Sequence, residues 1–445
     1  MSRTCIVGAG ISGLASAWQR TRRGEECTVL ESASQVGGAL CSIRKNGFLA
    51  EEGPNSIQVD SPHLENFLRS IPGLDEQIIV AKPEANKRYI IRDGKPIAVP
   101  MHPLQAISNP LWSLSAKLRL LREPWIQIAD ASSDESVADF ARRRLGEEFY
   151  QYAINPLVGG IYAGNPENLS LRHAFPKLHA MEQEHGSLLR GALARQRAAR
   201  KEGSSKPRKR IITFREGIDT LPRQIAQALG DRVQTGVSID SIKQKGDLWQ
   251  VEWNGQQESF DQVIVTIPAH SLNKLPFEAS LHRALAPLQE IEYPPVSVLS
   301  LGFKREQVAH PLDGFGVLVP ECEDRKILGV LFPSSVFTER APKDSVLLTV
   351  FIGGTRNPEE ATEDTDHLTQ TVLPEIESLL GTSGQPQFIH HRYWAKAIPQ
   401  YNTGYRSVFE QIETIEKTYP GLQLLGNYRS GVSLTNCLSV GQGFS

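Results

Sequence analysis

The sequence predicts an α/β protein in which a discontinuous Rossmann-like dinucleotide-binding domain is combined with a mixed-sheet domain and a helical domain. Three observations lead to this fold class. The stretch TCIVGAGISGL, residues 4–14, joins a short apolar run to a helical pattern through closely spaced glycines. The next apolar run, CTVLE at residues 27–31, ends in an acid. A second pattern of strand, glycine turn and helix start, LQLLGNYRSGVSLTNC, occupies residues 422–437.

The composition is that of an ordinary globular enzyme and excludes several classes of protein. The chain has 445 residues, a formal net charge of -2, 40% apolar and 22% charged residues. This near-neutral balance gives no electrostatic reason to expect nucleic acid as a partner. The five scattered cysteines have neither metal-ligand nor redox-motif spacing, which favours a reducing compartment and no metal site. No apolar run reaches roughly 18 residues and no secretory leader is recognised, so we expect a cytoplasmic protein without a transmembrane helix.

The N-terminal turn has the order of elements that binds a dinucleotide pyrophosphate. Gly8 allows the tight turn, Gly10 lets the backbone approach the phosphates, and Gly13 lets the helix pack closely on the strand. The start of the helix offers free N–H groups and a partial positive charge to the phosphates. The candidate cofactor residues of this turn are Gly8, Ala9, Gly10, Ile11, Ser12 and Gly13.

The acid at the end of the second predicted strand selects among dinucleotides. Glu31 lies about 20 residues after the glycines, the distance at which a carboxylate accepts the ribose hydroxyls. The same negative charge would repel a 2′-phosphate, so NADP is disfavoured. The glycines and this acid do not by themselves distinguish FAD from NAD.

The middle of the chain alternates between helical and strand patterns. Apolar residues recur at helical spacing between residues 103 and 200, and strand-like runs dominate residues 295–354 before a helix at 365–381. Asn254-Gly255 predicts a two-residue hairpin turn, and the run at 261–269 predicts a buried strand. His390 and His391 are adjacent on a predicted strand and therefore point to opposite sides.

A basic run, RQRAARKEGSSKPRKR at residues 195–210, stands out within this part of the chain. Its glycine and serine content predicts a solvated, mobile linker. Contact with anionic lipid headgroups is the alternative. Nucleic acid is a poor third interpretation, because no aromatic residues interleave the charges.

The segment after Glu31 resembles the FAD-binding start of the flavin amine oxidase and protoporphyrinogen oxidase superfamily. ESASQVGGALCS places Gly37-Gly38 after the acid, and EEGPNSIQ follows at residues 51–58. The resemblance implies FAD as the cofactor. Ala39 departs from the basic or bulky residue that usually follows the twin glycine. The further cofactor contacts that the resemblance implies are Glu31, Gly38, Ala39, Gly53, Pro54, Asn55, Ser56, Val237, Asn427, Val432, Ser433 and Leu434.

Four further motifs resemble the protoporphyrinogen oxidase family, in the same order along the chain. They are NPLVGGIYAGNPENLSLRHAFPKL (155–178), DGFGVLVP (313–320), AIPQYNTGY (397–405) and GNYRSGVSLTNC (426–437). The resemblance implies an FAD-dependent enzyme that oxidises protoporphyrinogen IX to protoporphyrin IX, with oxygen as acceptor. The flavin carries the redox chemistry, so no side chain is assigned a catalytic role. The family normally continues into a closing helix, whereas this sequence stops at SVGQGFS.

The same resemblance implies how the substrate is held. Arg88 matches an arginine that pairs with a propionate, for which a guanidinium fork is suited. Phe315 and Leu318 match an apolar pair that clasps a pyrrole ring, and Phe351 matches a further ring-facing position. Gly160 matches a glycine whose backbone faces the substrate. Strand residues such as these are often plain core residues, and only the family match gives them this role.

The predicted domains are discontinuous in the sequence. The FAD-binding domain takes residues 1–85, 208–272 and 395–445, the substrate-binding domain takes 86–100 and 273–394, and the helical domain takes 101–207. The helical segment from Leu104 to Trp125 predicts peripheral contact with the inner face of a membrane. The resemblance leaves open a homodimer and hand-over of the product to a chelatase.

Three alternative functions remain open from the sequence. Coproporphyrinogen III would be favoured by additional basic residues at the mouth of the substrate site. A flavin amine oxidase would need an aromatic cage beside the flavin. A non-catalytic paralogue that binds porphyrin is suggested by Ala39 and by the short C-terminal segment.

Overall fold

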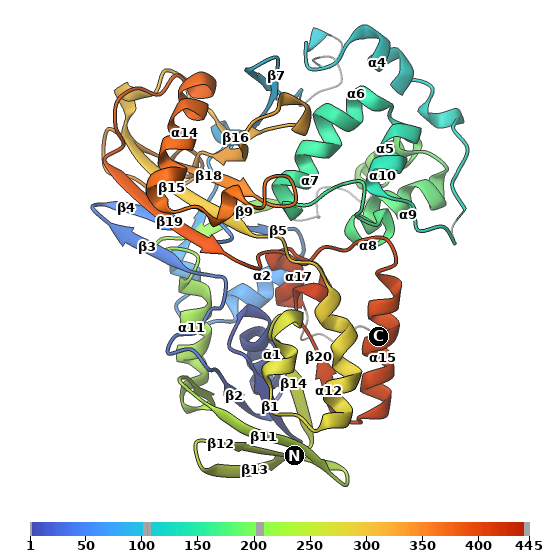
Figure 1. Ribbon diagram of the computed structural model, residues 1–445, viewed down its shortest axis with the longest axis vertical. Helices are drawn as coiled ribbons and strands as arrows, with labels where there is room; N and C mark the ends of the chain where they lie inside the picture. The colour runs from blue at the N-terminus through green and yellow to red at the C-terminus, as the bar shows by residue number, and fades with distance from the viewer. Residues whose placement is uncertain (1, 101–104, 106–107, 131, 202–208, 440–445) are drawn as a thin grey trace.

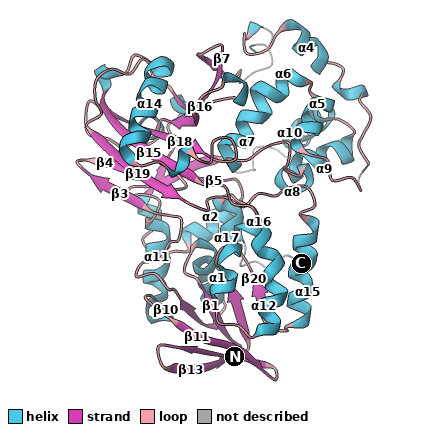
Figure 2. Cartoon of the chain, viewed as in Figure 1, coloured by secondary structure: helices cyan, strands magenta, loops and turns pink. Residues whose placement is uncertain are grey.

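The computed structural model describes residues 2–100, 105, 108–130, 132–201 and 209–439. Figure 1 shows a lower part that contains β1, β2 and β14, a large sheet at the upper left and a group of helices at the upper right. The strands, magenta in Figure 2, gather in the lower part and at the upper left. The α/β fold class predicted from the sequence is therefore confirmed.

A five-stranded parallel sheet forms the centre of the lower part. It collects short apolar strands from the beginning, middle and end of the chain, and such runs are typical of a sheet buried on both faces. Its strands, in spatial order, are β10 (Val233–Gln234), β2 (Glu26–Leu30), β1 (Arg3–Val7), β14 (Gln262–Val265) and β20 (Leu422–Leu424). The chain therefore returns to the same sheet after long excursions.

Helices and a hairpin layer cover this sheet. Helix α1 (Ile11–Arg22) contacts both α11 (Thr220–Leu229) and α17 (Leu434–Ser439), and the three share one apolar core with the sheet. The antiparallel strands β11 (Ile239–Lys245), β12 (Leu248–Trp253) and β13 (Gln256–Phe260) form a separate layer. Asn254 and Gly255 both have positive φ between β12 and β13, as the predicted hairpin turn requires.

A seven-stranded mixed sheet dominates the upper left of Figure 1. Its spatial order is β19 (Phe388–Trp394), β15 (Val296–Lys304), β18 (Ser345–Gly353), β17 (Ile327–Leu331), β16 (Gly314–Leu318), β7 (Lys87–Arg92) and β8 (Lys95–Ala98). One face packs against α14 (Thr365–Leu380), where alternate residues such as Val317, Val330 and Val350 are buried. The opposite face carries the intervening residues.

Helices between residues 114 and 201 form the upper right of the molecule. They are α4 (Leu114–Leu120), α5 (Val137–Arg144), α6 (Glu147–Phe149), α7 (Asn155–Tyr162), α8 (Leu171–Ala174), α9 (Pro176–His185) and α10 (Leu188–Lys201). A buried ion-pair cluster joins them, because Arg144 contacts the carboxylates of Glu123 and Glu182 with all three side chains almost fully buried. Within the described residues, no helix combines the length and apolar character needed to cross a bilayer.

The sequence predicted a mobile linker over the whole basic run at residues 195–210. The structure shows that part of this run has regular secondary structure. Its first part, through Lys201, belongs to α10, and Arg210 begins β9 (Arg210–Phe214). Alanine and arginine are good helix formers, and here they outweigh the low-complexity appearance of the run. Residues 202–208 lie outside the described part of the chain.

The remaining helices and strands lie outside the two large sheets. They are β3 (Ser42–Lys45), β4 (Phe48–Glu51), β5 (Ile57–Val59), α2 (Pro62–Arg69), β6 (Ile78–Val80), α12 (Ala279–Leu285), α13 (Pro333–Val336), α15 (Arg406–Thr418) and α16 (Asn427–Ser430). Among these, β4 and β5 flank residues 52–56; Phe48 of β4 packs against Phe388 of the mixed sheet, and β5 contacts α17.

Candidate functional site

The N-terminal glycine turn is closely packed on one side and open on the other. A Cβ atom on Gly13 would lie 2.0 Å from the carbonyl oxygen of Gly8, so only glycine lets α1 approach β1 this closely. Gly8 itself has φ +104, a conformation that side chains disfavour. A Cβ on Gly10 would meet nothing within 4 Å. The turn therefore leaves free space beside Gly10, where the sequence placed a pyrophosphate.

Glu31 is tied to this turn by its own carboxylate. One of its oxygens accepts a hydrogen bond from the Ala9 amide at 2.7 Å, and the other accepts from the Ala33 amide at 2.9 Å. The Val237 amide donates to the Glu31 carbonyl at 2.9 Å, which places the buried Val237 beside the acid. A carboxylate has further acceptor capacity, so these contacts are compatible with ribose hydroxyls as additional donors.

The twin glycine lies against the same turn. The Gly37 amide donates to the Ala9 carbonyl at 2.9 Å, and Gly10 and Gly37 form an isolated parallel bridge. A Cβ on Gly53 would lie 2.4 Å from the Ala39 carbonyl oxygen. The backbone on either side of Ala39 is thus held between the first turn and residues 53–56.

Residues 53–56 contain a buried acceptor that lacks a donor. The Asn55 carboxamide nitrogen donates to the Gly53 carbonyl at 3.1 Å. Its oxygen is buried and has no hydrogen-bond partner among the described residues. Buried polar atoms are nearly always paired, so this oxygen fits a site completed by a bound donor group. The N–H and O–H groups of a flavin nucleotide are donors of this kind.

The C-terminal segment joins the other cofactor candidates. The Ser433 hydroxyl accepts from the Asn436 amide at 3.2 Å and so caps the start of α17. Helix α17 contacts α1 and β5, and the Thr435 hydroxyl donates to the Gln58 carbonyl at 2.7 Å. Val432, Ser433 and Leu434 are therefore next to the segment that contains Asn55. Asn427 begins α16 nearby, between β20 and α17.

Three of the predicted substrate residues, Arg88, Leu318 and Phe351, fall on one face of the seven-stranded sheet. Leu318 is opposite Gly329, which is opposite Phe351, so Leu318 and Phe351 point to the same side. Arg88 is opposite Gly316 on this face, away from α14. A Cβ on Gly160 would lie 2.6 Å from a methyl carbon of Leu318, so the absence of a side chain lets α7 approach the sheet.

Arg88 differs from its basic neighbours because no described carboxylate pairs with it. Its guanidinium donates to the Asn86 carbonyl at 2.9 Å and stacks over the Phe315 ring, 5.1 Å from the centroid. Lys87, in contrast, pairs with Asp313. Partial burial lowers the pKa of Arg88, so the charge is partly desolvated without a compensating anion. An anionic group of a ligand would supply that compensation.

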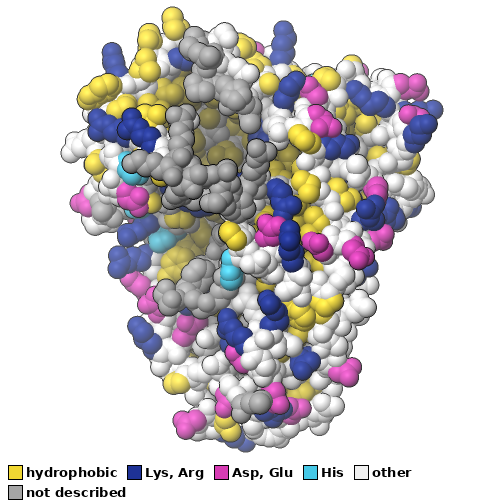
Figure 3. Space-filling view, turned by 180° about the vertical axis from the view of Figure 1, so that it is seen from behind, with side chains coloured by type: hydrophobic (Ala, Val, Ile, Leu, Met, Phe, Trp, Pro, Cys, Tyr) yellow, Lys and Arg dark blue, Asp and Glu magenta, His cyan; other side chains and the backbone are white. Residues whose placement is uncertain are grey.

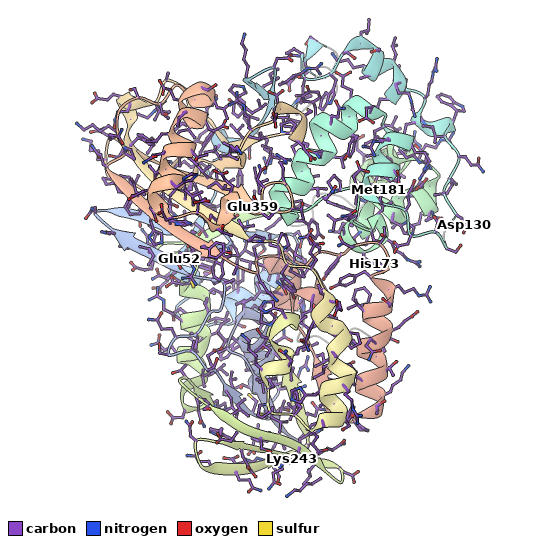
Figure 4. All side chains as sticks on the ribbon, in the orientation of Figure 1. Glu52, Asp130, His173, Met181, Lys243 and Glu359 are labelled. Carbon is purple, nitrogen blue, oxygen red and sulfur yellow. The ribbon has the colours of Figure 1, made fainter. Side chains whose placement is uncertain are left out.

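Glu52 connects the cofactor segment to the mixed sheet. The His390 ring nitrogen Nε2 lies 2.8 Å from a carboxylate oxygen of Glu52, and the Glu52 carbonyl accepts from the Trp394 indole at 2.7 Å. Figure 4 shows Glu52 at the junction between the lower part and the upper sheet. Trp394 packs in the same apolar cluster as Phe351. The contacts of Glu52 with His390 and Trp394 could not be predicted from the sequence, because residues so far apart in the chain have no characteristic spacing.

His390 and His391 point to opposite sides of β19, as predicted. His390 faces Glu52, whereas the His391 ring contacts the Ser297 hydroxyl at 2.8 Å and the Thr365 hydroxyl at 3.1 Å. Their alternation follows from the two-residue period of a strand.

Exposed apolar side chains gather on the helical part. Leu114, Leu118, Leu121 and Trp125 are 71%, 55%, 63% and 79% exposed. Figure 3 shows hydrophobic side chains at the upper edge of the molecule and around its middle. Contiguous exposed apolar surface is typical of an interaction site. The first residue of the segment predicted to meet a membrane, Leu104, lies outside the described residues.

Comparison with known proteins places the chain among flavoenzymes. The family model for flavin containing amine oxidoreductase matches residues 11–440. Protoporphyrinogen oxidase 2 of Arabidopsis thaliana is 35% identical, covering 99% of this chain and 92% of the relative. Coproporphyrinogen III oxidase of Bacillus subtilis is 26% identical, covering 98% and 96%.

Solved structures show the same fold. One from Exiguobacterium sp. 255-15, provisionally assigned as a protoporphyrinogen oxidase, has a TM-score of 0.81 at 24% identity and covers 99% of this chain and 97% of its own. Reduced UDP-galactopyranose mutase has a TM-score of 0.73 at 15% identity and covers 99% and 94%. At these identities the likeness establishes the fold alone.

Proposed function

We propose that this chain, which belongs to the flavin containing amine oxidoreductase family, is an FAD-dependent oxidase that converts protoporphyrinogen IX to protoporphyrin IX with oxygen as acceptor. The observation that carries the proposal is the sheet face bearing Leu318, Phe351 and Arg88, with Gly160 against it. An apolar surface ending in an unpaired guanidinium fits a flat tetrapyrrole with carboxylate side chains. The 35% identity with a protoporphyrinogen oxidase supports this substrate.

Four segments would hold the cofactor. The Gly8–Gly13 turn would bind the diphosphate, Glu31 the adenosine ribose, residues 38–39 and 53–56 the middle of the molecule, and residues 427 and 432–434 the flavin end. When bound, FAD would supply the redox chemistry, as acceptor of a hydride from a substrate carbon and as donor of electrons to oxygen. The unpartnered Asn55 oxygen would find its donor there.

The protein's own contribution is to bind, orient and dehydrate the substrate. Phe351 and Leu318 would lie against the ring system and keep water from it, while Phe315 supports the Arg88 guanidinium from one side. Arg88 would bind a propionate through paired hydrogen bonds and so fix the orientation of the ring. The proposal assigns no side chain a catalytic role.

Coproporphyrinogen III is the second candidate substrate. It carries more carboxylates than protoporphyrinogen IX and would need further uncommitted cations on this face. Lys87 and Arg92, the basic neighbours of Arg88, pair with Asp313 and Glu148. These two neighbours of Arg88 are therefore already paired, which favours the substrate with fewer carboxylates, although a relative that is 26% identical carries the name coproporphyrinogen III oxidase.

A direct assay separates these candidates from an amine oxidase and from a non-catalytic porphyrin-binding protein. The purified protein is loaded with FAD, and porphyrin fluorescence is followed under air with each porphyrinogen in turn. A faster rise with protoporphyrinogen IX is expected. A flavin spectrum without fluorescence gain on either porphyrinogen would refute the proposal. Oxidation of an amine under the same conditions would favour the assignment as an amine oxidase.

We infer a cytoplasmic protein that meets the inner face of a membrane through Leu114, Leu118, Leu121 and Trp125, because a hydrophobic substrate partitions into lipid. A homodimer and transfer of the product to a chelatase stay predictions, to be tested by sedimentation and by coupled assay. The domain limits given by the sequence also stay a proposal.

A further inference from the structure

We propose that two adjacent residues, Gln400 and Tyr401, are positioning residues that set the flavin-binding turn and the substrate-binding helix relative to each other. This inference rests on the proposed function, because it concerns the same two sites. Both residues belong to the AIPQYNTGY motif, which contains none of the proposed cofactor or substrate contacts. Both side chains are almost completely buried, at 2% and 3% exposure.

Tyr401 holds the turn that precedes α17. Its hydroxyl donates to the Asn427 carbonyl and accepts from the Gly431 amide at 2.9 Å. One hydroxyl thus closes both ends of residues 427–431, immediately before Val432. Tyr405 reinforces the same turn, since its hydroxyl donates to the Tyr428 carbonyl at 2.7 Å.

Gln400 holds the end of the substrate-facing helix α7. Its carboxamide nitrogen donates to the Tyr162 carbonyl at 2.9 Å, at the last residue of α7. A Cβ on Gly164 would lie 2.0 Å from the Gln400 carboxamide oxygen, so glycine is required for this approach. Gly160, which faces Leu318, lies less than one turn before Tyr162.

The backbone between the two side chains is fixed from both sides. The Gln400 amide donates to the Glu292 carbonyl at 2.9 Å, and the Tyr401 carbonyl accepts from the Ser170 amide at 2.8 Å. The Tyr401 ring also packs on Tyr405, with centroids 4.4 Å apart. Because neither residue can shift independently, the two sites share one rigid connection.

The first test removes only the Tyr401 hydroxyl. Tyr401→Phe leaves the Asn427 carbonyl and the Gly431 amide without their shared partner, so the FAD dissociation constant should rise about tenfold. The flavin absorption spectrum should change as well, because the turn beside the flavin relaxes. Tyr150→Phe, which loses a buried hydroxyl contact with Glu167 in the helical part, is the matched control and should leave FAD affinity unchanged.

The second test addresses the substrate side. Gln400→Leu removes the contact with the Tyr162 carbonyl and should raise KM for the porphyrinogen about tenfold while changing kcat less at saturating FAD. Gln411→Leu in α15, which loses a similar contact with the Ala284 carbonyl of α12, should leave KM unchanged.

The outcomes separate this inference from the proposed function. The inference about Gln400 and Tyr401 is overturned if Tyr401→Phe binds FAD within twofold of the parent. It is equally overturned if Gln400→Leu and Gln411→Leu have the same KM. Titration of FAD into the apoprotein measures the first effect without any turnover. If the parent binds FAD but oxidises no porphyrinogen, the proposed function fails while the Tyr401 test still stands.

Discussion

The glycines of the first turn show how one motif contains three different physical demands. Gly8 must be glycine because its φ is positive, and Gly13 must be glycine because a Cβ atom would overlap the backbone of Gly8. Neither reason applies to Gly10. Only Gly10 has free space where its side chain would be. The motif is therefore partly a requirement of packing and partly a requirement of the ligand.

This difference predicts opposite behaviour for two substitutions. Gly13→Ala should destabilise even the apoprotein, by about 2–3 kcal/mol, because its methyl group would overlap the Gly8 carbonyl. Gly10→Ala should leave the thermal unfolding of the apoprotein unchanged but weaken FAD binding strongly. Calorimetry and FAD titration of both variants provide the measurement, and equal loss of stability in the two would contradict the assignment.

Arg88 is the residue on which the substrate proposal depends most. Arg88→Gln should raise KM for protoporphyrinogen IX about tenfold with little change in kcat, because a charge-assisted contact to a propionate is lost. Stability should change little, since the described contacts of the guanidinium are one carbonyl and one ring. Lys87→Gln is the control, and an unchanged KM in the Arg88 variant would count against the anchoring role.

Glu51 predicts a pH dependence of stability. Burial raises its pKa to about 7, although the Ser42 hydroxyl, the Arg340 guanidinium and the Ile218 amide favour the ionised form, while Asp219 disfavours it. Because the folded state takes up a proton more readily than the unfolded state, Glu51 stabilises the fold fully below its unfolded pKa near 4.5. That stabilisation, on the order of 3 kcal/mol, is lost as the pH rises through about 7.

Replacing Glu51 with glutamine tests whether the protonated form of Glu51 is the one that stabilises the fold. The unfolding free energy of Glu51→Gln, measured by denaturant titration between about pH 5 and 8, should fall less with rising pH than that of the parent. A steeper fall in the variant would show that the ionised form is the stabilising one.

At the level of elements, register decides which residues of a strand meet the ligand. The strands β16 and β18 are mostly apolar, and periodicity alone could not say which alternate set is core. Packing of α14 on Val317 and Val350 settles this, because it leaves Leu318 and Phe351 on the other face. The sequence found these positions only through the family resemblance.

The exposed face of the α4 region predicts membrane contact. Leu118→Glu with Leu121→Glu should abolish co-flotation with vesicles of anionic phospholipid, without lowering the unfolding temperature, because both side chains are already exposed. The control is Leu248→Glu, an exposed apolar residue of β12 in the layer beside the parallel sheet. Flotation that persists in the double variant would refute this lipid-binding surface.

For the whole molecule, the proposed cofactor joins segments that are distant in sequence. Removing FAD should lower the unfolding temperature, and titrating FAD back should restore it, since a ligand that binds only the folded state stabilises it by an amount that grows with the logarithm of its concentration above Kd. The expected gain is about 2.7 kcal/mol at a hundredfold excess over Kd. An unfolding temperature independent of FAD would mean that the four segments do not form one binding site.

The sequence by itself determined the elements that local physics controls. Glycines that need positive φ, the Asn254-Gly255 turn, the short apolar strands and the acid after the second strand are all readable from residue type and spacing. Its error concerned Arg195–Lys201, where low-complexity composition concealed a stretch of good helix formers.

Only the tertiary structure decided how distant residues meet. The bond between Glu52 and His390, the single hydroxyl of Tyr401 that closes residues 427–431, and the carboxamide of Gln400 over Gly164 join parts of the chain without any fixed sequence spacing. Such contacts depend on the packing of both sheets together, whereas a turn or a helix depends on its immediate neighbours. The proposed cofactor site and substrate site are each visible in motifs, but their relative position is a property of the folded chain.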